Sequence, residues 1–312
     1  MFLHETAEFS HLIAIVGREH RIVPALIEKD YWIMHCLWGL KQAGFTFELK
    51  GGTSLSKGFG IINRFSEDID IRIAPPNDLP IGKNHTKPRH IEARQNFFDQ
   101  LATQITIDGI TSVDRDIEFD DKPRMRNAGI RLQYEHKNPI PSGVKHGVLL
   151  EAGFDQVTPN RNCDISSWVY DHAAKSDISD LIDNRALGVP CYEPGYTLVE
   201  KLQTISTKFR QQQKTGALPQ NFMRHYYDVY CLLQDRKVQD FIGTVEYLAH
   251  KENRFRAGDD KDITRNEAFV LSDPNVHKLY SDAYDAPTAL YYRSKPSFSE
   301  VLAIIQTDSA RL

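Results

Sequence analysis

Two aspartates alternate with isoleucines in the run Asp68-Ile69-Asp70-Ile71. Successive side chains of a strand point to opposite faces, so this run would place both carboxylates on one face and both isoleucines in the core. Upstream, Gly51-Gly52-Thr53-Ser54 has the composition of a turn that opens a helix, where backbone N–H groups and the positive end of the helix dipole attract a phosphate. Paired carboxylates beside such a turn predict divalent-metal binding and phosphoryl chemistry on a nucleotide.

Each motif alone has an ordinary structural explanation. Thr53 and Ser54 are common helix caps, and an Asp-x-Asp pair on a strand is usually a solvated face or part of an ion pair. The order and spacing of the two motifs are more specific, and they resemble the first signature of the nucleotidyltransferase superfamily that includes DNA polymerase beta. The sequences of the two motifs, GGTSLSKG over 51–58 and RFSEDIDI over 64–71, resemble more closely those of the AbiEii/AbiGii family of bacterial nucleotidyltransferase toxins.

The resemblance implies roles for the residues around both motifs. The residues expected to bind the nucleotide are Gly51, Gly52, Thr53, Ser54, Lys57, Arg64 and Ser66. The alternatives are that Lys57 faces solvent and that Arg64 only pairs with a neighbouring acid, Glu67 or Asp68. Lys29 and Asp30 belong to a Lys-Asp-Tyr run that is similar to one of the family, and they would flank the nucleotide unless they lie on a solvated helix face.

A third carboxylate is expected near the aspartate pair, because the superfamily that this chain resembles uses three acids to hold one or two Mg²⁺ or Mn²⁺ ions against the triphosphate. Glu151 is the best candidate, since it is a lone acid in the apolar run 148–154 and a buried carboxylate is costly unless it is paired or binds a metal. It would also draw the proton from the attacking hydroxyl if it lies within hydrogen-bond reach. The alternatives are a structural ion pair with Arg131, or Asp155 as the third acid.

A second pair of sequence motifs lies in the C-terminal half of the chain. The run LVEKL over 198–202, followed by RHYYD over 224–228, is similar to the later signature of the AbiEii family. The resemblance implies that Lys201 contacts the nucleotide phosphates and that Asp228 orients Lys201 or the substrate hydroxyl; a mobile ammonium suits charge that builds on a triphosphate. The alternatives are a weak surface ion pair and Lys208, about two helical turns further on, as the catalytic lysine. His225 stands where the family commonly has an aspartate.

The spacing of apolar residues predicts the elements that position these motifs. In the first 75 residues we expect helices over 6–18, 24–43 and 53–61 and strands over 45–50 and 68–74. Pro75 stops the last of these strands, which carries the two aspartates. The later elements expected are a helix over 88–106, strands around 111–119, 128–135 and 147–154, and helices over 196–213, 222–233, 238–250 and 298–308.

This order of elements predicts an α/β (α+β) fold. We expect a nucleotidyltransferase-like mixed, twisted sheet flanked by helices, followed by a helical C-terminal domain. The boundary is expected near residue 190, in the segment 188–190, whose glycine and proline interrupt the pattern. Residues 1–190 would form the nucleotidyltransferase core with its N-terminal helices, and residues 191–312 would form a helical domain that completes the active site.

Composition narrows the class of protein. A chain of 312 residues is long enough for one large or two medium domains. Its net charge of −4 gives no overall basic signature, so a nucleic acid would have to be met by a local patch. Four widely separated cysteines indicate neither a zinc knuckle nor a disulfide scaffold. The N-terminus lacks the basic start of a signal peptide and no apolar run approaches membrane-spanning length, so a cytoplasmic protein without a membrane partner is expected.

The resemblance also implies a biological role. The chain would be the toxin of a toxin–antitoxin or phage-defence pair, transferring NMP from an NTP to an acceptor, with the 3′ end of a tRNA as the expected acceptor. The antitoxin need not bind the chain directly. The alternatives are a small-molecule or protein acceptor, and a non-catalytic protein that binds NTP and acts through a partner. The basic residues available to an RNA acceptor are Lys83, Lys87, Arg89, Lys122, Arg124, Arg126, Arg131, Lys208, Arg210 and Lys214.

Overall fold

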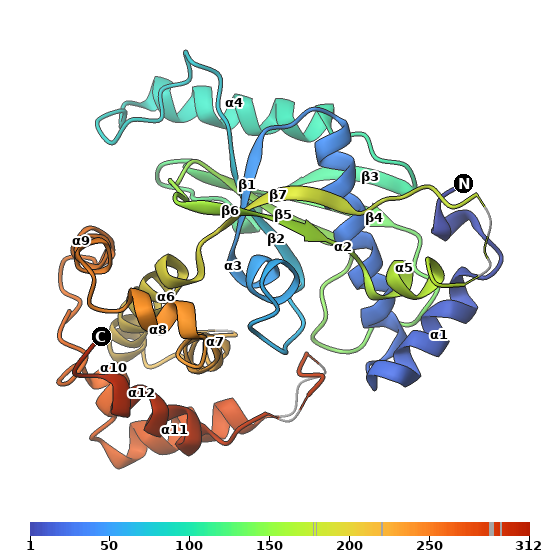
Figure 1. The fold of residues 1–312 in the computed structure, drawn as a ribbon. Coiled ribbons are helices and arrows are strands. Elements are labelled where there is room, and N and C mark those ends of the chain that lie inside the picture. The colour runs from blue at the N-terminus through green and yellow to red at the C-terminus, as the bar shows by residue number, and fades with distance from the viewer. Residues whose placement is uncertain (177, 179, 220, 287–289, 294) are drawn as a thin grey trace. The chain divides into compact units, whose positions relative to one another are not determined.

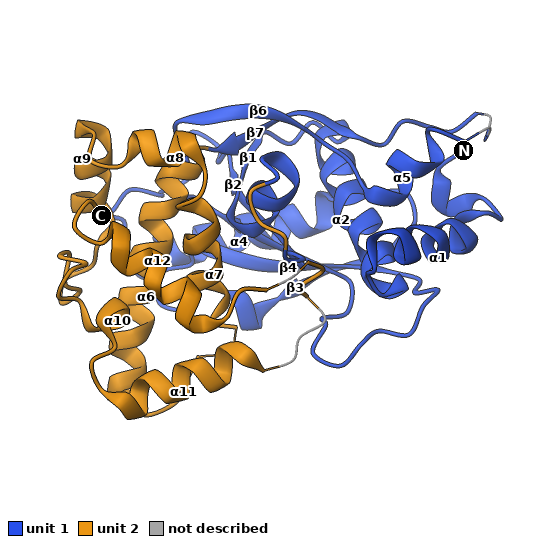
Figure 2. Cartoon of the chain, turned by 60° about the horizontal axis from the view of Figure 1, so that its bottom comes forward, with its two compact units in different colours: residues 1–60, 64–192 blue, residues 61–63, 193–312 orange. Residues whose placement is uncertain are grey.

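The chain divides into two compact units, which Figure 2 colours separately. The computed structural model describes residues 1–176, 178, 180–219, 221–286, 290–293 and 295–312. The first unit holds residues 1–60 and 64–192, and the second holds residues 61–63 and 193–312. Among the described residues, no helix combines the length and the apolar character needed to cross a membrane.

The first unit is built on one seven-stranded sheet with the order β3-β4-β5-β2-β1-β7-β6 (Figure 1). Its strands are β1 (Phe47–Lys50), β2 (Asp68–Ile73), β3 (Ile110–Asp116), β4 (Asn127–Tyr134), β5 (Val148–Gly153), β6 (Asn160–Ile165) and β7 (Ala186–Tyr192). The β2–β5 and β1–β7 pairs are parallel and the other pairs are antiparallel. The prediction of a mixed α/β sheet flanked by helices is confirmed, and the aspartate strand β2 is its central strand.

Helices complete the first unit. They are α1 (Phe9–His20), α2 (Pro24–Gln42), α3 (Gly51–Thr53), α4 (Pro88–Gln104) and α5 (Trp168–Ala173), with short 3₁₀ turns η1 (Leu3–Glu5) and η3 (Ile117–Phe119). The predicted helix over 53–61 is shorter than expected and starts earlier: α3 begins at Gly51 and continues into a π-helical turn, η2 (Ser54–Gly58). Gly51 has a φ of +73°, which lets the chain leave β1 and enter the helix without a linker.

The two faces of the sheet differ in chemistry. Ile69 pairs with Leu150 and Leu150 pairs with Ile130 across β2, β5 and β4, so these three buried side chains share one face. Tyr134 lies on the same face, four residues further along β4, and the ring of Trp32 in α2 stacks on it at a centroid distance of 4.9 Å. Helix α2 therefore covers the isoleucine face, and the alternating residues of β2, including both aspartates, lie on the opposite face.

Several secondary-structure elements of the first unit were not predicted from the sequence. No strand was expected over β6 or β7 and no helix over α5, and the segment 188–190, where the domain boundary was expected, lies inside β7. Gly188 has a φ of +62°, and Pro190 pairs with Asn162 of β6 in the antiparallel register. Both residue types normally interrupt a strand, so their tolerance here depends on local pairing that the sequence does not reveal.

The second unit is mainly helical over its described residues. Its helices are α6 (Pro194–Thr215), α7 (Arg224–Leu232), α8 (Arg236–Phe241), α9 (Val245–Arg254), α10 (Glu267–Val270), α11 (Pro274–Asp285) and α12 (Phe298–Asp308). The prediction of one helix over 238–250 is wrong, because the chain breaks between α8 and α9. Gly243 there has a φ of +83°, and the Thr244 hydroxyl caps α9 by accepting from the Tyr247 N–H. Helices α10 and α11 were not expected.

Candidate active site

The three predicted metal ligands lie on neighbouring strands in matching register. In the parallel pair of β2 and β5, Asp70 stands opposite Glu151 and Asp68 stands opposite Leu149. Directly paired residues point to the same face of a sheet, and so do residues two apart on one strand, so all three carboxylates project from the same face. Asp68 is buried, whereas Asp70 and Glu151 are half-buried. The fallback acid, Asp155, is exposed and lies beyond the end of β5.

Two glycines bring the helix-opening turn against this acidic face. A Cβ on Gly51 would lie 2.2 Å from the Oδ2 atom of Asp70. A Cβ on Gly52 would lie 2.5 Å from the Ser66 hydroxyl and 3.0 Å from the Nη2 atom of Arg64. Only a residue without a side chain permits both approaches. The structure thus gathers five of the predicted residues around one turn.

The hydroxyls of the turn hold it in place. Thr53 Oγ1 donates to the backbone carbonyl of Asp68 at 2.5 Å, and Ser54 Oγ donates to the carbonyl of Gly51 at 3.0 Å. Both side chains are buried. Each hydroxyl has a single proton, and here that proton is engaged by a carbonyl oxygen. Thr53 therefore ties the turn to the aspartate strand.

A lysine that the sequence analysis missed lies on the metal-ligand candidate Asp68. The ammonium of Lys145 is 3.1 Å from Oδ1 and 3.0 Å from Oδ2 of Asp68, and it also lies over the Phe119 ring at 4.6 Å. Lys145 belongs to the connection between β4 and β5, for which the sequence analysis names no site residue. No spacing rule relates this segment to Asp68, because the contact spans 77 positions.

Helix α2 anchors the connection that carries Lys145. Lys29 donates to the backbone carbonyl of Lys145 at 2.5 Å and lies 3.5 Å from Glu67, whose carboxylate accepts from the backbone N–H of Lys145 at 2.9 Å. Burial lowers the pKa of Lys29 to about 8, opposed by the charge of Glu67. Lys29 and Asp30 are both 1% exposed, so the alternative that they form a solvated helix face is wrong.

Lys57 and Asp30 form a second buried ion pair. The Lys57 ammonium is 2.8 Å from Oδ1 of Asp30 and lies 3.9 Å from the ring centroid of Trp168. The backbone N–H of Trp168 donates to the same carboxylate at 2.9 Å. Burial raises the pKa of Asp30, and the charge and hydrogen bond of Lys57 oppose that rise. The alternative that Lys57 faces solvent is therefore wrong; Lys57 joins the π-helical turn to α2 and α5.

The acids fit a hard divalent cation in donor type. Carboxylate oxygens are the ligands that Mg²⁺ and Mn²⁺ prefer, and Asp68 already attracts a cationic side chain. In the part of the chain that the structure describes, however, no three His, Cys, Asp or Glu side chains are gathered closely enough to hold a metal ion. Arg131, the alternative partner of Glu151, donates to Asp116 at 2.6 and 3.0 Å and to the His146 carbonyl at 3.1 Å.

The second unit contains the other predicted pair. The Lys201 ammonium is 2.9 Å from Oδ2 of Asp228, with side chains 12% and 0% exposed, so the alternative of a surface ion pair is wrong. His225 Nδ1 lies 3.5 Å from the same ammonium. Burial, and then the positive charges of Lys201, Lys208 and Arg224, hold the pKa of His225 well below its usual value. A neutral imidazole can accept from Lys201, whereas an imidazolium would repel it.

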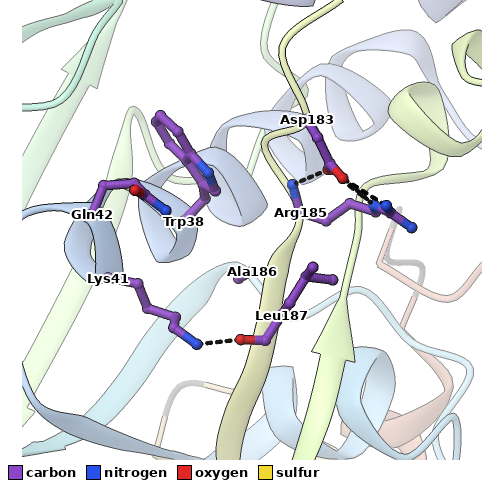
Figure 3. Close-up of a pocket in the computed structure, with 7 residues that line it drawn as sticks. All are labelled: Trp38, Lys41, Gln42, Asp183, Arg185, Ala186 and Leu187. Carbon is purple, nitrogen blue, oxygen red and sulfur yellow. Dashed lines mark hydrogen bonds and ion pairs between the residues drawn. The ribbon is translucent and has the colours of Figure 1, made fainter.

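A separate pocket of the first unit involves none of these residues. Its lining comes from α2 and β7 and the segment before β7: Trp38, Lys41, Gln42, Asp183, Arg185, Ala186 and Leu187 (Figure 3). The Asp183 and Arg185 side chains pair at 2.6 Å, and Lys41 donates to the Leu187 carbonyl. Its charged side chains are engaged with one another or with backbone, and none of the predicted site residues lines it.

The chain was compared with protein families, with curated proteins and with solved structures. The family model described as nucleotidyl transferase AbiEii toxin, type IV TA system, matches residues 38–304. A solved structure, of an antigenic nucleotidyltransferase-like protein from Paracoccidioides brasiliensis, is similar with 13% identity and a TM-score of 0.38, covering 87% of this chain and 99% of that chain. A likeness at that level adds nothing to the fold described above. No curated protein matches the chain.

Proposed function

The chain belongs to the AbiEii nucleotidyltransferase toxin family of type IV toxin–antitoxin systems, and from that premise we propose that it transfers NMP from an NTP to the 3′ end of a tRNA with the help of Mg²⁺ or Mn²⁺. The observation that carries the proposal is the register of β2 and β5. It sets Asp70 opposite Glu151, with Asp68 on the same face, beside a turn that two glycines keep free of side chains.

The reaction assigns a step to each group. The acceptor hydroxyl oxygen forms a bond to the α-phosphorus, the bond from that phosphorus to the bridging oxygen breaks, and pyrophosphate leaves with the electron pair. Glu151 takes the proton of the hydroxyl. Asp68, Asp70 and Glu151 would hold the divalent cation, which supplies neutralisation of the triphosphate charge when bound. The glycine turn lets its backbone approach the phosphates.

Lys201 and Asp228 act in the same reaction in this proposal. The ammonium stabilises negative charge on the phosphates, and the buried carboxylate keeps the lysine oriented and charged. The support is the 2.9 Å pair and the complete burial of Asp228. Lys208 has the weaker claim, because the fully buried carboxylate lies against Lys201.

A basic surface of the first unit supports an RNA acceptor. Buried Arg94 donates to the carbonyls of Arg124 at 2.6 and 2.9 Å, Pro80 at 2.5 Å and His85 at 3.2 Å. This one guanidinium holds the loop before α4 against the turn before β4. The exposed basic residues of these two segments and of the first turn of α4 are Lys83, Lys87, Arg89, Lys122 and Arg124. A local patch of this kind gives an acidic chain a means to bind RNA phosphates.

The test measures transfer of label. Purified protein is incubated with total bacterial RNA, Mg²⁺ and each α-³²P-labelled NTP in turn, alongside Asp70→Asn and a control, Asp78→Asn, which changes an exposed acid of a loop. We expect a labelled band of tRNA size with the wild type and the control, and a loss of about 10³-fold or more with Asp70→Asn.

Other outcomes separate the alternatives. Equal labelling by Asp70→Asn would rule out the acidic face as the reaction centre. Label that enters a protein or a small molecule of a cell extract, but no RNA, would replace the acceptor and keep the transfer. Binding of NTP without label in any acceptor would favour a non-catalytic protein that acts through a partner.

A further inference from the structure

Lys145 occupies both oxygens of Asp68 at once. The two distances from its ammonium, 3.1 and 3.0 Å, are nearly equal, so the lysine lies where a cation bound by this carboxylate would lie. Asp68 is 7% exposed at its side chain and Lys145 is 25% exposed. An ammonium and a divalent cation repel each other strongly at the short distance that one carboxylate imposes. A metal can therefore take Asp68 only if the Lys145 ammonium leaves it.

The backbone of Lys145 is held on both sides of its Cα atom. Its N–H donates to Glu67 and its carbonyl accepts from Lys29, and both of these side chains are almost completely buried. The start of the same connection is also fixed, because the buried Glu28 carboxylate accepts from the backbone N–H groups of Lys137 and Asn138 at 2.7 and 3.0 Å. The side chain of Lys145 can thus leave Asp68 by rotation about its own bonds, while its Cα atom stays beside the acidic face.

A lysine displaced in this way remains next to the expected nucleotide. Its ammonium is a compact point charge on a flexible four-carbon stem, suited to a phosphate oxygen. Before a metal binds, the Lys145 ammonium on the Asp68 carboxylate also reduces the repulsion among the three acids on this face of the sheet. The contacts that fix the connection between β4 and β5 come from Glu28, Lys29 and Glu67, and the first two precede residue 38, where the family match begins.

We propose that Lys145 is an exchangeable cation of the active site: it occupies Asp68 in the absence of metal and, once a divalent cation takes Asp68, its ammonium binds the phosphates of the NTP. The proposal rests on the function proposed above, because it needs the metal to bind at Asp68. It predicts that the Lys145 side chain has opposite effects on two binding equilibria. Lys145 should weaken metal binding to the free protein and strengthen nucleotide binding to the metal-loaded protein.

The experiment uses the full chain and needs no turnover. Binding of Mn²⁺ alone is measured by electron paramagnetic resonance for the wild type, Lys145→Met, Asp68→Asn and a matched control, Lys137→Met. The control removes a lysine from the same connection, whose side chain pairs with the exposed Glu135. Binding of a non-hydrolysable NTP analogue at saturating Mn²⁺ is then measured by calorimetry.

We expect Lys145→Met to bind Mn²⁺ about tenfold more tightly than the wild type and the analogue about tenfold more weakly, which is the usual size of coupling between two binding events. Lys137→Met should match the wild type in both, and Asp68→Asn should lose Mn²⁺ binding. Lys145→Gln provides the same readout if the methionine variant folds poorly, since the contacts that fix this connection are made by the Lys145 backbone.

Two results would overturn the proposal. Unchanged or weaker Mn²⁺ binding by both Lys145 variants, with binding still lost in Asp68→Asn, would make Lys145 a structural partner and leave the proposed function intact. Equal Mn²⁺ binding by the wild type and Asp68→Asn would refute the metal site itself, and the proposed function would fail together with this inference. Tighter Mn²⁺ binding with unchanged affinity for the analogue would refute the phosphate-binding half alone.

Discussion

Two lysine–aspartate pairs of the first unit have the same chemistry and different surroundings. In the Lys57–Asp30 pair the ammonium lies against the Trp168 ring, and the carboxylate accepts a further hydrogen bond from the Trp168 backbone. In the Lys145–Asp68 pair the lysine side chain is 25% exposed, compared with 11% for the side chain of Lys57. Burial and a third partner make the first pair a permanent connection between elements. Partial exposure leaves the second pair able to exchange its cation.

The comparison predicts different costs for removing the two carboxylates. Asp30→Ala should lower the free energy of unfolding by about 3–5 kcal/mol, because it leaves the Lys57 ammonium buried without its counter-ion. Asp68→Ala should change it by only about 1 kcal/mol or less, since the Lys145 side chain is partly exposed. Urea unfolding of both variants measures the difference. Equal costs would show that burial does not distinguish the pairs.

The Lys201–Asp228 pair of the second unit is also buried, and here we expect the loss of the lysine to lower the rate of catalysis. Lys201→Ala should lower kcat by about 10²–10³-fold, the loss typical of removing a group that stabilises charge in the transition state. Lys208→Ala removes the same charge two turns along α6 and should change kcat by less than about threefold. Steady-state kinetics with the acceptor found in the labelling experiment checks both. The reverse order of effects would move the catalytic role to Lys208.

A buried group without an opposite charge should respond to pH instead of to the loss of a partner. His35 Nε2 lies 2.9 Å from the Asp108 carbonyl and Nδ1 lies 2.9 Å from Asn184 Nδ2, and burial lowers the pKa of this histidine to about 4. The unfolded chain takes up the proton near pH 6.5, where the folded chain does not. The contribution of His35 to stability should therefore be constant above about pH 6.5 and should fall by at most about 3 kcal/mol as the pH decreases to 4.

The measurement for this prediction is urea unfolding between pH 4 and pH 7. His35→Gln should flatten the decline by the amount that the histidine contributes, whatever other groups titrate in the same range. An identical slope in the wild type and His35→Gln would mean that another group causes the decline.

The elements that the sequence predicted well are those whose pattern is local. Alternation alone places Asp68 and Asp70 on one face of a strand, and the long helices α2, α4 and α6 follow from apolar spacing. The break at Gly243 was missed because a single glycine in a helical pattern is often tolerated. Strand β7 was missed because Gly188 and Pro190 resemble the end of an element.

The burial of the polar residues of α2 could not be predicted from the periodicity of its apolar residues. Lys29 and Asp30 are polar residues of a helix, and such residues usually face water. Here the sheet covers one side of α2, as the stacking of Trp32 on Tyr134 shows, and α1 and α5 cover others through Tyr31 and Asp30. Both charged side chains are consequently buried, and each requires its own ion pair.

Four groups of residues with chemical potential could be found from the sequence by itself: the two aspartates on one face, the lone glutamate in an apolar strand, the glycine turn, and the Lys201 and Asp228 pair. These are properties of short segments, and strand and helix periods are enough to predict them. Only the tertiary structure decided that Asp70 stands opposite Glu151, that α2 buries two ion-paired charges and that Lys145 lies on Asp68. The physical reason is that pairing register and loop anchoring depend on contacts between residues far apart in the chain, which no local period encodes.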